Sequence, residues 1–132
     1  MDKKTVVEWF KFADQDVFAV NHLLTAYPQP YEIICYHCQQ AAEKYLKGYL
    51  VYNDIKPPKI HELDTLCEMC SKIDDKFDDI IKECLTLTVY GVQARYPYEI
   101  EIDEYQMKKA VEAMNKIKNF ALLKEVLETV SK

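Results

Sequence analysis

Residues 34–51 read ICYHCQQAAEKYLKGYLV, and this stretch decides how the chain folds. It lies inside a longer run bounded by the proline-containing segments TAYPQP at 25–30 and NDIKPPK at 53–59. Apolar and small side chains recur along the run at spacings of three and four residues, so the sequence predicts a helix over about Tyr31–Tyr52. The residues that form this stripe are Ile34, Cys38, Ala41, Ala42, Tyr45 and Tyr49.

Similar stripes predict helices on both sides of this run. Before it, apolar residues repeat from Val6 to Leu24, and the helix should end at Pro28 and Pro30, which remove backbone donors. After it, we expect a third helix from near His61 and another helical segment from Phe77 toward Gln93.

A long last helix is expected from Met107 to Ala121, started by a capping box of Asp103 and Gln106. The sum is an all-α fold, an antiparallel up-and-down bundle of four main helices plus a shorter one. With no linker or repeat in the sequence, residues 1–132 should form a single domain.

Composition limits the class of function. The net charge is −5 and no block of the chain is basic, which argues against DNA binding or a broad electrostatic grip on RNA but allows a local phosphate patch. There are two glycines and neither a GxGxxG nor a Walker sequence, so those nucleotide-binding classes are excluded. No run resembles a signal peptide or a membrane span, and with five cysteines a reduced, cytoplasmic protein away from membranes is expected.

Two CxxC pairs, Cys35 with Cys38 and Cys67 with Cys70, raise the question of a metal. Four thiolates at this spacing can bind zinc, and a zinc-stapled helical domain is one hypothesis. Both pairs, however, fall inside periodic helical segments, where cysteine packs as a small hydrophobe. We therefore interpret the cysteines as core residues and predict neither a metal site nor a cofactor.

A polar stripe accompanies the apolar one on the helix over Tyr31–Tyr52. His37, Gln40, Lys44 and Lys47 fall within about 80° of each other at 100° per residue. An imidazole, an amide and two ammonium groups on one surface suit an anion such as phosphate. A solvated face with a helix-stabilising Glu43–Lys47 pair is the alternative, and periodicity alone favours it.

These residues also carry a resemblance. ICYHCQQAAEKYLKGYLV resembles the second-helix signature of the HEPN domain family (higher eukaryotes and prokaryotes nucleotide-binding domain). WFKFADQDVFAVNHLL at 9–24, KIHELDTL at 59–66 and ARYPYE at 94–99 are similar to the family's first helix, third-helix opening and turn before the last helix. The signature residues matched here are Tyr36, His37, Gln39, Gln40, Ala41, Glu43, Lys44, Leu46 and Lys47.

The resemblance implies an all-α bundle that forms homodimers across a shared cleft. Many members are toxins encoded beside a minimal nucleotidyltransferase, and the active ones are metal-independent ribonucleases. Those members carry an arginine that holds the phosphate and, after four to six intervening residues, a histidine that moves a proton. Here Arg95 is present, but the positions expected to hold the histidine, residues 100–102, are Ile, Glu and Ile. Partner enzymes modify a tyrosine two residues after that histidine; this chain has no exact match for it, and Tyr98 is the nearest tyrosine.

The resemblance and the residues together lead to one main hypothesis and one alternative. The main hypothesis is a non-catalytic homodimeric subunit that binds a nucleotide or RNA phosphate and associates with a minimal nucleotidyltransferase. The alternative is a ribonuclease that uses Arg95 with a displaced histidine, His37. Arg95 could equally lock its turn by pairing with an acidic residue, and His61 is expected to cap the third helix. The candidate binding residues are His37, Gln40, Lys44, Lys47, Arg95 and Tyr98.

Overall fold

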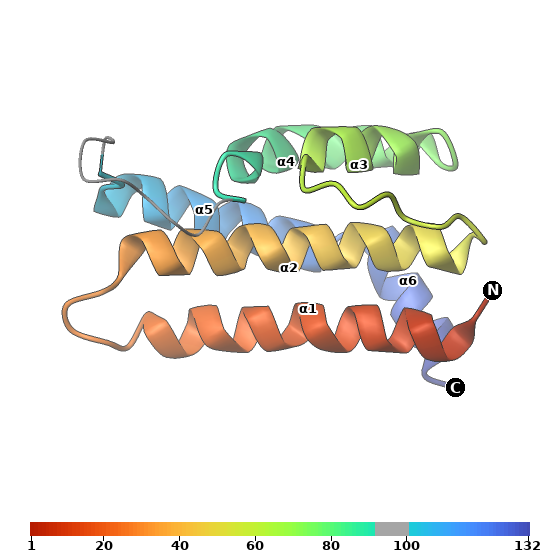
Figure 1. The fold of residues 1–132 in the computed structure, drawn as a ribbon, viewed down its shortest axis with the longest axis horizontal. Helices are drawn as coiled ribbons and strands as arrows, with labels where there is room; N and C mark the ends of the chain where they lie inside the picture. Colours follow the sequence, from red (N-terminus) through yellow and green to blue (C-terminus); the bar gives the residue numbers. More distant parts are fainter. Residues whose placement is uncertain (92–100) are drawn as a thin grey trace.

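The computed structural model describes residues 1–91 and 101–132, and within these residues all regular structure is helical (Figure 1). The all-α class is therefore confirmed, and the second helix has the predicted bounds. The elements are α1 (Lys3–Leu23), α2 (Tyr31–Tyr52), α3 (Leu63–Ser71), the 3₁₀ helix η1 (Asp75–Ile80), α4 (Ile81–Thr88), α5 (Glu104–Lys118) and α6 (Ala121–Val130).

The long helices α1 and α2 lie side by side and run in opposite directions, while α5 lies along α2 and runs in the same direction (Figure 1). The connector after α2 returns along that helix, and α3 and α4 then cover the side of α2 away from α1. The predicted arrangement of four main helices plus one is not confirmed in detail. Three helices are long, and the others are short segments of 6 to 10 residues.

The last predicted helix is wrong in one respect, because it breaks between α5 and α6. Asn119 caps α5, and Phe120 takes an extended conformation with φ −62° and ψ 130°. The Phe120 ring packs at 5.0 Å, centroid to centroid, against Phe77, a fully buried residue. The partly buried Phe120 ring thus packs on the core at the break, and α6 then packs against α1. The predicted capping box of Asp103 and Gln106 is present at the start of α5.

Close packing of α1 on α2 depends on Gly48. A Cβ atom at this position would lie 3.2 Å from Trp9 Cβ and 3.1 Å from Phe10 Cε1. Tyr45 and Tyr49 are buried in the core, and Tyr52 is partly buried and packs against it.

The five cysteines are buried and none forms a disulfide, as the interpretation of core cysteines predicted. Cys67 Sγ donates to the carbonyl oxygen of Phe77 at 3.3 Å, and burial raises the pKa of Cys38 and of Cys70 above the ordinary thiol value. In the described part of the chain, which holds every cysteine and histidine, no three of His, Cys, Asp or Glu are placed to hold a metal ion. No helix of residues 1–91 and 101–132 has the length and hydrophobicity needed to cross a membrane.

Candidate functional site

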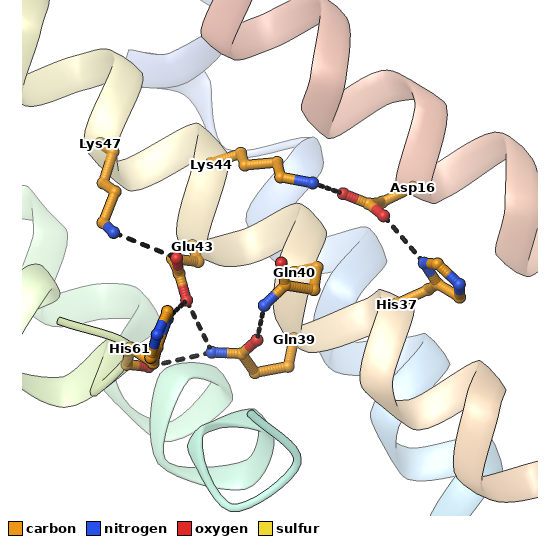
Figure 2. A network of polar contacts seen from close by, with 8 residues as sticks. All are labelled: Asp16, His37, Gln39, Gln40, Glu43, Lys44, Lys47 and His61. Carbon is orange, nitrogen blue, oxygen red and sulfur yellow. Dashed lines mark hydrogen bonds and ion pairs between the residues drawn. The ribbon is translucent and has the colours of Figure 1, made fainter. Parts of the chain in front are cut away.

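Two networks of polar side chains lie along α2 (Figure 2). We call the first the Asp16 cluster, which consists of Asp16, His37 and Lys44. We call the second the Glu43 cluster, which consists of Gln39, Gln40, Glu43, Lys47 and His61. Both contain a carboxylate bonded to a histidine and a lysine, but they differ in burial and in how many bonds the carboxylate makes.

The Asp16 cluster joins α1 to α2. His37 and Lys44 are seven residues apart, two helical turns, so they lie on the same face of α2. His37 Nδ1 is 2.8 Å from Asp16 Oδ1, and Lys44 Nζ is 2.5 Å from Asp16 Oδ2. The Asp16 side chain is 9% exposed, whereas those of His37 and Lys44 are 28% and 25% exposed. A nearly buried carboxylate thus holds two half-buried nitrogen groups at the surface.

This geometry leaves hydrogen-bonding capacity on the solvent side of the cluster. Imidazole has two ring nitrogens, and only Nδ1 of His37 is engaged by Asp16. The Lys44 ammonium has three donors, and the carboxylate takes one of them. Within the described residues neither side chain has a second hydrogen-bond or ion-pair partner. The Lys44 ammonium can therefore donate to an anion that approaches from solvent, and Nε2 of His37 can do so when the imidazole is protonated.

The Glu43 cluster joins α2 to the connector that precedes α3. Glu43 Oε2 accepts from Lys47 Nζ at 3.1 Å, and Oε1 lies 3.2 Å from Gln39 Nε2 and 3.0 Å from His61 Nδ1. Gln39 also donates to the carbonyl oxygen of His61 at 2.9 Å and accepts from Gln40 at 2.8 Å. The side chains of Glu43 and Lys47 are each 7% exposed. The buried carboxylate and ammonium of this cluster bond to each other, and the bonds to the exposed His61 fix the connector on α2.

The predicted binding residues therefore divide between the two clusters. His37 and Lys44 meet on Asp16, whereas Gln40 and Lys47 belong to the Glu43 cluster. The Glu43–Lys47 pair exists, but it is buried, so the prediction of a solvated pair on an exposed face is wrong. Arg95 and Tyr98 lie outside the described residues.

His61 has a different role from the predicted one. The N-cap of α3 is Glu62, which makes no side-chain capping bond, and the His61 ring lies on Glu43 instead. The prediction that His61 caps the third helix is therefore wrong. The residue at the N-cap position of α3 is Glu62, one position after His61. The His61 ring contacts Glu43 of α2 and not the backbone at the start of α3.

Sequence reasoning did not assign Asp16 to the site. One signal was available: Asp16 stands between Ala13 and Val20 at helical spacing, which puts an acidic residue on the apolar stripe of α1. A buried carboxylate needs partners, so this position predicts basic groups on the facing helix.

Comparison with families of known proteins gives a match to the family model described as HEPN domain, over residues 6–126. Neither the curated proteins nor the solved structures include one that matches the chain significantly. The matched range covers nearly the whole chain and contains both clusters.

Proposed function

Because the chain belongs to the HEPN domain family, we propose that it binds a phosphate group of RNA at the Asp16 cluster without cleaving it. In this proposal it acts as a homodimeric subunit, and a minimal nucleotidyltransferase partner supplies the chemistry. Membership in the family supports a role with nucleotides or RNA.

The observation that carries the proposal is the position of His37 and Lys44 above Asp16. The carboxylate holds both nitrogen groups in place, so neither side chain loses much conformational freedom when an anion binds. Lysine acts as a point charge toward phosphate, and a protonated imidazole adds a directional hydrogen bond from its second ring nitrogen. With a net charge of −5, the chain should bind RNA through this local contact and lose affinity as salt rises.

The absence of cleavage is inferred from the sequence around Arg95. The positions where the family's nuclease histidine is expected hold Ile100, Glu101 and Ile102. The two isoleucines carry no group that exchanges protons, and Glu101 has a carboxylate in place of the imidazole that the family's nuclease motif uses at the RNA 2′-oxygen.

One observation favours ribonuclease activity as a second candidate function. The hydrogen-bonding contact between Asp16 and His37 resembles the pairing by which a carboxylate orients an acid–base histidine. In that case His37 would move the proton and Arg95 would hold the phosphate.

The two candidates differ in one measurable property, cleavage of RNA. Purified chain is incubated in EDTA with a labelled RNA oligomer that carries 5′- and 3′-hydroxyl ends, and both binding and fragments are followed. We expect intact RNA and an affinity about tenfold lower in His37→Ala and in Lys44→Ala, a loss of one charge-assisted contact. Lys72, at the C-terminal end of α3, is exposed and lies outside both clusters. Lys72→Ala removes the same charge as Lys44→Ala and should keep the RNA affinity of the original chain.

If the original chain produces RNA fragments, and if His37→Ala and Arg95→Ala do not, the chain is a ribonuclease and the non-catalytic function is rejected. Equal RNA affinity of the original chain, His37→Ala, Lys44→Ala and Lys72→Ala would reject the Asp16 cluster as the binding site. Sedimentation of the same samples tests the homodimer, and co-purification with the product of an adjacent nucleotidyltransferase gene tests the partner.

A further inference from the structure

A separate cavity of about 540 Å³ opens where the start of α1 meets the connector that follows α2. In Figure 1 the N-terminus, the end of α2 and the start of this connector lie at the same end of the molecule. The volume falls within the range of small-molecule sites in proteins. Among the residues that line it are Trp9 from α1, Lys47 from α2, and Lys56, Pro57, Pro58 and Lys59 from the connector.

The wall of the cavity is largely apolar. Trp9 is partly buried, and the consecutive rings of Pro57 and Pro58 lie with it in the lining. The Lys47 ammonium, held by Glu43, is 5.9 Å from the centroid of the Trp9 ring. An aromatic side chain at a partly open site offers a stacking surface to a nucleobase.

The charges at the rim are mostly basic. Lys56 and Lys59 are exposed, and neither has a hydrogen-bond or ion-pair partner among residues 1–91 and 101–132. Of the two aspartates in the lining, Asp2 is engaged in capping α1 through Thr5, and Asp54 contacts the amino group of Met1. Two unpaired ammonium groups beside an aromatic wall fit a ligand with one planar apolar part and one anionic part.

We propose that this cavity binds a nucleotide, with the base against Trp9 and the phosphates at Lys56 and Lys59. The lining of this cavity includes none of Asp16, His37 and Lys44, so the cavity and the Asp16 cluster are different sites. The proposal goes beyond the RNA-phosphate site and uses none of its residues. A free nucleotide and the phosphorylated end of an RNA share this chemistry.

Trp9 is the sole tryptophan of the chain, so its fluorescence reports on this cavity directly. The full chain is titrated with ATP, AMP, adenosine, and an RNA oligomer with or without a 5′-phosphate. We expect saturable quenching by ATP, with adenosine about tenfold weaker because it lacks the anionic part. The double variant Lys56→Ala/Lys59→Ala should lose about tenfold in ATP affinity, and the matched control Lys72→Ala/Lys76→Ala should lose less than about twofold.

The arms of the titration also identify the source of the nucleotide. Quenching by ATP and AMP but not by RNA assigns a free nucleotide, and quenching only by the 5′-phosphorylated oligomer assigns an RNA end; both support the proposal. Absence of saturable quenching by all of these ligands overturns it, as does equal loss of affinity in the two double variants. His37→Ala should leave the ATP response unchanged, so failure of this site and failure of the Asp16 cluster are observed separately.

Discussion

The Asp16 and Glu43 clusters have the same three chemical groups and opposite surroundings. In each, a carboxylate contacts Nδ1 of a histidine and Nζ of a lysine. Lys44 is 25% exposed and makes one bond, whereas Lys47 is 7% exposed and lies between Glu43 and Trp9. The same chemical groups therefore occur in two different environments. In the proposed function, exposure and unused hydrogen-bonding capacity distinguish the Asp16 cluster as the site that binds a ligand.

The largest expected effect is on the Glu43 cluster. Glu43→Ala leaves the Lys47 ammonium buried without its carboxylate, and should lower the free energy of unfolding by about 3 kcal/mol. Urea denaturation measures this. Glu104→Ala removes the glutamate of another i,i+4 Glu–Lys pair, but one that is more than half exposed, and should cost less than about 0.5 kcal/mol. Similar losses in the two variants would contradict the structural role of the Glu43 cluster.

The free energy of unfolding should fall at alkaline pH, because titratable groups are buried in the core that supports both clusters. Burial raises the pKa of Cys38 and Cys70, and burial with the hydrogen bond to Asp14 raises that of Tyr45, so these groups stay protonated in the folded chain. The unfolded chain releases protons once the pH passes the ordinary thiol pKa of 9.0, which favours unfolding. Between pH 8 and pH 10 the free energy of unfolding should fall by more than about 1 kcal/mol. A stability that is constant over this range would contradict the burial of these groups as protonated species.

A smaller loss is expected when the Asp16 cluster is opened. Asp16→Ala removes a carboxylate whose partners can reach solvent, so the free energy of unfolding should fall by only about 1 kcal/mol. RNA affinity should fall as well, because His37 and Lys44 lose the group that positions them. Denaturation and RNA titration of the same sample test both. A loss of stability as large as that of Glu43→Ala would remove the difference between the clusters.

The smallest effect is expected at His61. Its side chain is 66% exposed, so its bond to Glu43 competes with water and is weak. His61→Ala should change the free energy of unfolding by less than about 0.5 kcal/mol, since Lys47 and Gln39 still satisfy Glu43. A loss above 2 kcal/mol in urea denaturation would mean that the histidine, and not the lysine, is the main partner of Glu43.

The sequence predicted the parts of the fold that depend on local periodicity. The bounds of α2, the buried stripe of α1, the capping box at Asp103 and the burial of the cysteines follow from residue spacing along single helices. The break at Phe120 could not be predicted in this way, because it depends on the distant ring of Phe77. Tertiary packing overrides a helical pattern that would otherwise continue.

The candidate site was predicted in part for the same reason. Helical spacing placed His37 and Lys44 on one face, but their bonds to Asp16 depend on how α1 and α2 align. Lys47 shares that face in a helical projection and is nevertheless buried, because it pairs with Glu43 and lies beside Trp9 and the connector after α2. The path of a connector is not encoded in the periodicity of the helix that it covers.

The most direct test of the account compares Lys44 with Lys47, three residues apart on one helix. RNA with hydroxyl ends is titrated against the original chain, Lys44→Met and Lys47→Met, at a temperature where all three are folded. We expect the RNA affinity to be about tenfold lower in Lys44→Met but unchanged in Lys47→Met. We expect the free energy of unfolding to be lower in Lys47→Met but not in Lys44→Met. The opposite pattern, with RNA affinity lost in Lys47→Met and kept in Lys44→Met, would show that the Asp16 cluster is not where RNA binds.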